Sequence, residues 1–337
     1  MKKLTYRINP NTQKARKSRN EGKETDDDYE FGYIQKKMKP FFDRDSHFVE
    51  DKKSKIVDFT NELNNSRIKY RINHFLRCRQ KKNLPNYIPN KYLPEYFNKD
   101  SKIDDNTLWF VKPNEGKGGE GIIITKDPKE YVDKDYAIQK QIIPNLVNER
   151  IWTVRMYIIA NYFDGKLKFW MTGNGIVRLA TFEYEKDSQE YNQLITNEAS
   201  IKRYTNNYKN RLPKNLAEKI SSKLLRKMDN YQIRIKNLKT MMKESKDKLK
   251  ENFEPNKEVN ASYHVLGVDI MFDKNEKPYV LEINRCPAFC LTPPVIKYGD
   301  KMIFHYEERL YIEIIKNFIK RPLRDKTPIS NNFLFEI

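Results

Sequence analysis

Short runs of apolar and β-branched residues recur through the middle of the chain and predict a series of strands. The predicted strands cover residues 108–112, 121–125, 137–142, 152–160, 167–172 and 175–181. Because the links between them are too short for repeated helical crossovers, this spacing predicts a mostly antiparallel sheet. Two later strands, 265–272 and 278–283, are separated by five polar residues that indicate a hairpin turn.

Apolar residues spaced alternately three and four apart predict helices in the C-terminal part. Between residues 216 and 249 this stripe comprises Ile220, Leu224, Met228, Tyr231, Ile235, Leu238 and Met242. It is typical of one long amphipathic helix or of a helix pair, and a further helix is expected at 302–319. Strands in the middle followed by helices indicate the α+β class.

Changes in composition divide the chain into three parts. Residues 1–30 are polar and nearly free of aliphatic side chains, which predicts a flexible basic arm. Residues 31–105 have mixed character and several prolines, and we expect a small N-terminal α/β lobe. Residues 106–337 then form the main region, which contains a basic helical insertion at 202–258.

Charge indicates an anionic partner. The chain has 65 Lys and Arg against 46 Asp and Glu, a net charge of +19. Residues 202–258 alone hold 17 basic and 7 acidic side chains, so about half of the excess lies in the insertion. The partner could be a nucleic acid, a membrane surface, a nucleotide or an acidic protein segment. A solvated helix face is the alternative explanation for the insertion.

Other sequence features exclude several classes of protein. The apolar runs are far shorter than the roughly 20 residues that cross a bilayer. The charged start does not lead into the apolar segment of a secretory signal. Three cysteines, Cys78, Cys286 and Cys290, do not form a disulfide framework or a metal-binding pattern, so we expect reduced thiols.

A glycine-rich loop follows the first central strand. Lys112 ends that strand, and four of the 11 glycines lie within the next nine residues. Glycine allows backbone N–H groups to approach phosphate oxygens, and a lysine supplies positive charge to them. The spacing fits neither a Walker A motif nor a dinucleotide fingerprint, since a strand follows the loop where those motifs need a helix. An ordinary hairpin loop is the alternative.

A second group of polar residues lies on the two late strands. Asp269, Glu282 and Asn284 can project to one face of a strand pair, because strand side chains alternate between faces. Two carboxylates and an amide oxygen suit Mg²⁺ that bridges nucleotide phosphates. The alternative is a polar sheet edge paired with lysines, but the strands are otherwise apolar and a buried carboxylate needs a cation.

The ordered motifs resemble the tubulin–tyrosine ligase-like family of ATP-grasp ligases. They are Trp109 to Gly121, Gln139-Lys140-Gln141-Ile142, Arg155, Gly175-Ile176-Val177-Arg178, Thr196-Asn197, Gly267-Val268-Asp269 and Glu282-Ile283-Asn284-Arg285-Cys286-Pro287. The resemblance extends from about residue 73 to residue 288. It implies an ATP-grasp fold, with a mostly antiparallel central sheet, flanking helices and ATP and Mg²⁺ as cofactors.

The resemblance also implies roles for individual residues. Arg155 and Arg178 would lie across the transferring phosphoryl group, where fixed positive charge stabilises the transition state. An N-terminal lysine that reaches the nucleotide matches Lys81 or Lys82, and we assign Lys82. The other implied ATP-binding residues are Lys112, Gly118, Gly119, Gly121, Gln139, Lys140, Gln141, Ile142, Thr196 and Asn197. The implied Mg²⁺ ligands are Asp269, Glu282 and Asn284.

The chain departs from the family pattern in two places. Ile151-Trp152-Thr153 stands where the family usually has Lys-Phe-Asp, and Leu194 stands where it usually has His. These positions surround the nucleotide and the incoming amino acid in relatives. The phosphate and metal residues are nevertheless complete, which favours a working enzyme.

The implied function is an ATP- and Mg²⁺-dependent ligase that joins glutamate, glycine or tyrosine to a carboxylate of an acidic acceptor, with tubulin tails as the expected acceptor. The reaction would pass through an acyl phosphate. We expect a cytoplasmic, microtubule-associated protein without membrane contact. Lys223, Arg226, Lys227, Arg234 and Lys246 should face solvent and dock the acceptor near the active site. The alternative is a non-catalytic module that binds microtubules or another polyanion, and a nucleic-acid binder comes third.

Overall fold

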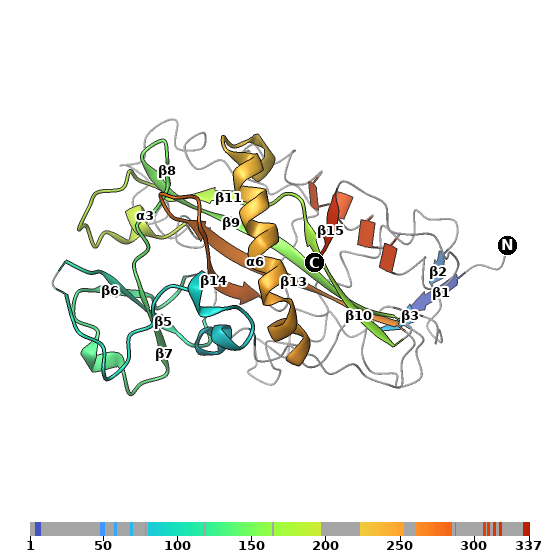
Figure 1. Ribbon diagram of the computed structural model, residues 1–337, viewed down its shortest axis with the longest axis horizontal. Coiled ribbons are helices and arrows are strands. Elements are labelled where there is room, and N and C mark those ends of the chain that lie inside the picture. Colours follow the sequence, from blue (N-terminus) through green and yellow to red (C-terminus); the bar gives the residue numbers. More distant parts are fainter. Residues whose placement is uncertain are drawn as a thin grey trace.

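The computed structural model describes most of the predicted main region (Figure 1). The described residues are 4–7, 48–50, 57–58, 68–69, 78, 80–104, 106–116, 119–163, 165–196, 223–252, 261–284, 287, 306–307, 309–310, 313–314, 317–318 and 333–337. Among them, no helix is long and apolar enough to cross a membrane.

A large sheet forms the centre of the molecule. Its strands are β1 (Leu4–Arg7), β2 (Phe48–Glu50), β3 (Val57–Asp58), β4 (Ile68–Lys69), β8 (Leu146–Val147), β9 (Arg150–Phe163), β10 (Lys166–Thr172), β11 (Ile176–Leu179), β12 (Lys223–Leu224), β13 (Ala261–Phe272), β14 (Pro278–Asn284) and β15 (Leu334–Glu336). The order β12-β11-β9-β13-β4-β3-β1-β2 forms the main path, with β14 on β13 and β10 on β9. The pairs around β9 are antiparallel, which confirms the expected α+β arrangement.

A smaller antiparallel sheet lies to one side of the large sheet. It has the order β6-β5-β7, from β5 (Trp109–Pro113), β6 (Ile123–Thr125) and β7 (Tyr136–Lys140). Short 3₁₀ turns lie at Lys81–Asn86, Asn90–Tyr92, Lys129–Tyr131 and Leu225–Lys227, and α3 is the single turn Tyr191–Leu194. The glycine-rich loop therefore joins two antiparallel strands, as the sequence predicts.

Helix α6 (Tyr231–Glu251) covers one face of the large sheet (Figure 1). Its buried apolar residues, among them Leu238 and Met242, belong to the same core as Trp152 and Val154 of β9. Successive side chains on a strand point to opposite faces, so Ile151, Thr153 and Arg155 project from the face that α6 does not cover. The basic helix and the predicted site residues therefore lie on opposite sides of the sheet.

The predicted helix at 216–249 begins later than expected. Lys223 and Leu224 form β12, which pairs with β11, and a 3₁₀ turn follows before α6 starts. Leu224 pairs with Ile176 of β11, and Leu224 and Leu225 are both buried in the core. Asn230 adopts the left-handed conformation (φ 57°) directly before the helix. Residues 216–222 lie outside the described residues.

Arg234 was expected at the solvent-exposed face, and that prediction is wrong. It is 3% exposed, and its Nε and Nη2 donate to the Glu276 carboxylate at 2.7 and 2.8 Å. Glu276 lies in the turn between β13 and β14, and the Arg234 guanidinium stacks 4.6 Å from the Trp152 ring centroid. This buried ion pair connects α6 to the hairpin formed by β13 and β14. Arg226 and Lys227 are exposed and Lys246 is partly exposed, whereas the side chain of Lys223 is not described.

The described N-terminal segments join the main sheet. Four residues of the expected arm form β1, which pairs in parallel with β2 and β3, and β4 pairs in parallel with β13. In the described residues of 31–105 the helical segments are 3₁₀ turns. The boundaries at 30 and 105 remain predictions. Of the expected helix at 302–319, the described residues 306–307, 309–310 and 313–314 are helical.

Candidate active site

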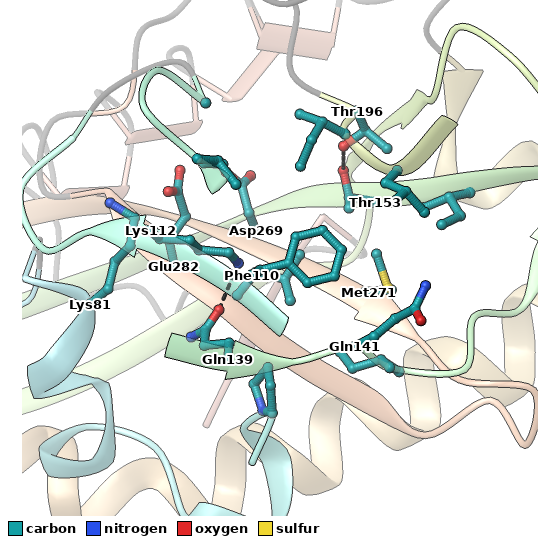
Figure 2. A pocket seen from close by; sticks show the side chains of 18 of the residues that line it. Lys81, Phe110, Lys112, Gln139, Gln141, Thr153, Thr196, Asp269, Met271 and Glu282 are labelled. Atoms are coloured by element: carbon teal, nitrogen blue, oxygen red, sulfur yellow. Dashed lines mark hydrogen bonds between the residues drawn. The ribbon is translucent and has the colours of Figure 1, made fainter. Parts of the chain in front are cut away.

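A pocket lies between the two sheets, on the face of the large sheet that α6 leaves uncovered (Figure 2). Ten of the predicted site residues line it: Lys112, Gly119, Gln139, Lys140, Gln141, Ile142, Arg178, Thr196, Asp269 and Glu282. Strands β5 and β7 supply one wall, while β9, β11, β13 and β14 supply the other. Residues far apart in the sequence thus meet in one cavity.

The metal-ligand candidates are held in neighbouring positions by strand register. Asp269 on β13 pairs across the sheet with Arg155 on β9 and with Glu282 on β14, so the three form one row. Asn284 Nδ2 donates to Glu282 Oε1 at 2.9 Å and lies 3.4 Å from Asp269 Oδ2. The three side chains therefore lie on one face of the strand pair, where Asn284 directs its amide nitrogen to the two carboxylates.

Arg155 is engaged by Asp269. Its Nη2 donates to Asp269 Oδ2 at 2.7 Å, and its Nε donates to the other carboxylate oxygen. The side chain is buried and does not line the cavity among the described residues. Gly267 makes room for it, because a Cβ at that position would lie 3.1 Å from Arg155 Cδ. Arg178, on β11 opposite Thr153, lines the pocket directly.

The two carboxylates have different electrostatic environments. Burial acts to raise the pKa of Asp269, but the Arg155 guanidinium outweighs burial and holds it at about 2. Burial raises the pKa of Glu282, and the negative charge of Asp269 adds to this effect. A buried carboxylate with a raised pKa is stabilised by an added cation, so these oxygens fit a hard divalent metal.

Two lysines face these carboxylates from the other wall. Lys112 Nζ donates to Gln139 Oε1 at 2.6 Å, and burial lowers the pKa of Lys112 to about 8. Lys81 Nζ donates to the backbone oxygens of Pro113 and Gly116 at 3.1 and 3.3 Å, and burial lowers its pKa as well. A bound anion beside either ammonium group would raise its pKa again, because a nearby negative charge favours the protonated form.

Lys81, and not Lys82, lines the pocket. Lys82 Nζ donates to the Lys134 backbone oxygen at 2.9 Å and lies 3.5 Å from Asp135 on the surface. The two lysines follow each other in a 3₁₀ turn, so they point in different directions. The sequence choice of Lys82 is corrected accordingly. Tyr96, which the sequence did not single out, connects this turn to Gln139 through hydrogen bonds of 2.8 and 2.9 Å.

The glycine-rich loop also lines the pocket. Gly119 has a φ of 73° and Gly121 has a φ of 70°, values that side-chain-bearing residues rarely adopt. Gly119 lines the cavity, whereas Gly121 packs against Pro113 outside it. The hydroxyl of Tyr191 in α3 donates to the Gly119 backbone oxygen and holds the loop against the large sheet. Gly118 and Asn197 lie outside the described residues.

The other end of the pocket is apolar. Ile151 and Leu194, two of the residues at which the sequence departs from the expected pattern, pack in one cluster with Leu108, Phe110 and Met271. Thr153 Oγ1 and Thr196 Oγ1 are 2.7 Å apart, which forms a buried hydroxyl pair beside this cluster. The Gln141 N–H donates to the Leu108 backbone oxygen at 2.8 Å. Lys140 directs its ammonium to Glu95, 3.0 Å away.

Comparisons with known proteins match this arrangement to one family. The sequence model described as "TTL: Tubulin-tyrosine ligase family" matches residues 45–302. The "Probable tubulin polyglutamylase ttll-9" of Caenorhabditis elegans is 25% identical over 295 residues, covering 78% of this chain and 68% of the relative. The match, with the α+β sheets, confirms the ATP-grasp fold that the resemblance implied.

Two further relatives are longer proteins. The "Tubulin polyglutamylase TTLL7" of Xenopus tropicalis is 29% identical over 204 residues, which cover 54% of this chain and 22% of the relative. The "Tubulin glycylase 3B" of Drosophila melanogaster is 24% identical over 230 residues, which cover 62% of this chain and 30% of the relative. The chain therefore spans less than a third of the length of these two relatives.

Proposed function

Because this chain belongs to the tubulin-tyrosine ligase family, we propose that it is an ATP-dependent ligase that joins an amino acid to a carboxylate of an acidic protein. The observation that carries the proposal is the pocket between the sheets, where buried lysines face paired carboxylates. The names of the relatives, polyglutamylases and a glycylase of tubulin, support glutamate or glycine as the donor and tubulin as the acceptor.

The charged end of the pocket is proposed to bind the nucleotide phosphates. Lys112 and Lys81 supply positive charge from β5 and the 3₁₀ turn, and burial lowers the pKa of both, an effect that a bound anion would offset. Gly119 and Gly116 line the same end and provide a backbone that can approach phosphate oxygens closely. Lys81 replaces Lys82 in this role because only Lys81 lies in the cavity.

Asp269, Glu282 and Asn284 are proposed to hold Mg²⁺. All three can offer oxygen atoms, which is the ligand chemistry that Mg²⁺ prefers. A bound Mg²⁺ would orient the β- and γ-phosphates and neutralise charge that develops on them. For the protein, the consequence is that Asp269 must then divide its oxygens between Arg155 and the ion.

The apolar end is proposed to hold the adenine ring. Phe110, Ile151, Leu194 and Met271 form an apolar space of the kind that binds a base. Since the Gln141 N–H already donates to Leu108, the base edge would be read by the Gln141 carbonyl oxygen and the Ile142 N–H. Lys140 would contact the base through the aliphatic part of its side chain, because its ammonium group donates a hydrogen bond to Glu95.

The proposed reaction has two steps. An acceptor carboxylate oxygen attacks the γ-phosphorus of ATP, so that the bond to the β-phosphate oxygen breaks and ADP leaves. The amine of the free amino acid then attacks the acyl carbon of the acyl phosphate, and inorganic phosphate leaves as the amide forms and the amine loses a proton. Arg178 lines the cavity and is proposed to stabilise the negative charge of the first transition state, while Arg155 positions Asp269.

Mass spectrometry of the products tests this proposal. The protein is incubated with Mg²⁺, ATP, a mixture of amino acids and tubulin, and tubulin tails are then analysed for added residues. We expect additions that need ATP and are absent with Glu282→Gln, which keeps the shape of the side chain but removes its charge. Unmodified tubulin, together with no modification of any acidic protein in a cell extract, would contradict the ligase assignment.

A second candidate is a non-catalytic module that binds an acidic polymer. It is favoured by the position of α6, whose exposed lysines Lys236, Lys243 and Lys250 face away from the pocket. They recur every seven residues and so form one line along the helix. Nucleotide-independent binding to microtubules without ADP formation would favour this candidate over the ligase.

A further inference from the structure

Strand register brings three polar side chains together on the small sheet. Gln139 on β7 pairs with Phe110, two residues before Lys112 on β5, so Gln139 and Lys112 are diagonal neighbours. On the other side of β7, Tyr96 lies directly opposite Gln139 in an antiparallel bridge. Side chains that are opposite or diagonal in paired strands point to the same face. The Gln139 side chain therefore lies between Lys112 and Tyr96.

A chain of three hydrogen bonds connects these side chains to the second lysine of the pocket. Lys112 Nζ donates to Gln139 Oε1 at 2.6 Å (Figure 2), and Gln139 Nε2 donates to the Tyr96 hydroxyl oxygen at 2.9 Å. The Tyr96 O–H donates in turn to the backbone oxygen of Lys81 at 2.8 Å. An ammonium group can only donate, so it fixes the direction of every bond in the chain. One hydroxyl group thus connects Lys81 to Lys112.

The chain holds two positive charges that repel each other. Lys81 and Lys112 are 5% and 9% exposed. Burial lowers the pKa of Lys112 to about 8, and the positive charge of Lys81 acts in the same direction, so the two ammonium groups interact. Without hydrogen bonds that hold them, the two side chains would move apart. A nucleotide would then have to bring them together again, which would weaken its binding.

We propose that Tyr96 is a positioning residue that holds Lys81 and Lys112 in place for the phosphates of the nucleotide. This inference rests on the proposed function, in which the two lysines meet the phosphates. Tyr96 is not among the described residues that line the pocket, so it acts through the lysines rather than by contact with the nucleotide. Burial raises the pKa of Tyr96 to about 12, so its hydroxyl stays protonated and keeps both bonds near neutral pH.

Nucleotide binding by Tyr96→Phe, which removes only the hydroxyl group, tests this inference. Dissociation constants of a non-hydrolysable ATP analogue with Mg²⁺ and of adenosine are measured by calorimetry for the unchanged protein and the variant. We expect the analogue to bind about tenfold more weakly to the variant, because the two hydrogen bonds that hold the lysines are lost. Adenosine has no phosphates, so its dissociation constant should change by less than about twofold.

Tyr92→Phe is the matched control. Tyr92 is buried in the same segment, but its hydroxyl interacts with Glu244 of α6. Both of its dissociation constants should stay within about twofold of those of the unchanged protein. Tyr96→Phe should fold, because the Lys81 N–H also attaches the turn to the Asn114 backbone oxygen at 3.2 Å. Thermal melting checks this, and if Tyr96→Phe does not fold, Gln139→Met breaks the same chain and carries the same expectations.

A double variant tests the connection through Gln139. Tyr96→Phe and Gln139→Met interrupt one chain, so their combined loss of affinity for the analogue should be smaller than the product of the two single losses. A combined loss equal to that product would mean that the two residues act independently, and it would contradict the chain.

The outcomes separate this inference from the proposed function. If the analogue and adenosine lose affinity equally in Tyr96→Phe, Tyr96 only supports the pocket wall and the positioning role is refuted. If neither dissociation constant changes, the hydroxyl does not hold the lysines, and the inference fails while the nucleotide site stands. If the unchanged protein binds the analogue no more tightly than adenosine, the lysines do not meet phosphates, and the proposed phosphate site fails together with the inference.

Discussion

Lys112 makes nucleotide affinity depend on pH in a way that the structure specifies. Burial lowers the pKa of Lys112 to about 8 in the free protein, from a usual value of 10.5. A triphosphate beside the ammonium favours its charged form, so the pKa rises again in the complex. Nucleotide binding must then take up a proton above pH 8, and affinity must fall as pH increases.

The expected magnitude follows from this pKa. With half of the lysine deprotonated at pH 8 and about nine tenths at pH 9, the dissociation constant should increase about eightfold between pH 7.5 and pH 9. The ammonium of Lys81 contributes in the same direction, since burial lowers its pKa too. ATP itself is fully ionised in this range, so the protein dominates the effect.

Calorimetry with Mg²⁺ and a non-hydrolysable ATP analogue measures this effect. Titrations at pH 7.5, 8, 8.5 and 9, each in two buffers with different heats of ionisation, give both the dissociation constant and the number of protons taken up. The matched control is Lys112→Arg, because a guanidinium stays charged throughout this range. Its affinity should vary much less with pH, with only the contribution of Lys81 remaining.

Two results would refute this reasoning. A dissociation constant that stays level from pH 7.5 to 9 in the unchanged protein would mean that Lys112 does not meet the phosphates. If the dissociation constant of Lys112→Arg depended on pH as strongly as that of the unchanged protein, another group would take up the proton.

Three further predictions concern catalysis, stability and partner binding. Arg178→Ala should lower the rate of ADP formation about 100-fold or more while the ATP dissociation constant changes less than threefold, and equal losses in both would mean that Arg178 only binds ground-state nucleotide. Arg234→Met should lower the free energy of unfolding by about 3–5 kcal/mol in denaturant titrations, because it leaves the buried Glu276 unpaired, whereas the exposed Lys236→Met should cost less than about 0.5 kcal/mol. Changing Lys236, Lys243 and Lys250 to Glu should raise the KM for polymerised tubulin and weaken the salt dependence of that KM. The KM for a short acidic peptide should stay unchanged, because α6 lies across the sheet from the pocket. An equal rise in the KM for the peptide would contradict that geometry.

The central strands were predictable from short runs of apolar and β-branched residues, and the carboxylate group was predictable because strand side chains alternate between faces. Asp269 and Glu282 lie in otherwise apolar strands, and the short link between the strands leaves an antiparallel hairpin as the simplest pairing. The same alternation along β9 would have placed Ile151 and Thr153 on the face of the strand that carries Arg155. That signal was present but was used only for the arginine.

Other features depended on tertiary contacts that no local pattern contains. Lys81 and Lys82 are two consecutive lysines, so the local sequence does not distinguish them. Only the direction of the 3₁₀ turn decides which side chain enters the cavity. Arg234 occupies a helical position that reads as exposed, but a glutamate 42 residues later and the ring of Trp152 bury it. Leu224 continues the helical stripe, yet pairing with Ile176 makes it part of a strand.

The transfer of oxygen from the acceptor to phosphate tests the central claim most directly. An acidic acceptor with ¹⁸O-labelled side-chain carboxylates is incubated with the protein, Mg²⁺, ATP and the donor amino acid, and the released phosphate is analysed by mass spectrometry. Activation through an acyl phosphate predicts that each phosphate released with an amide bond carries one ¹⁸O, and that Glu282→Gln releases no labelled phosphate. Amide formation with unlabelled phosphate, or with AMP and pyrophosphate as products, would contradict the proposed chemistry.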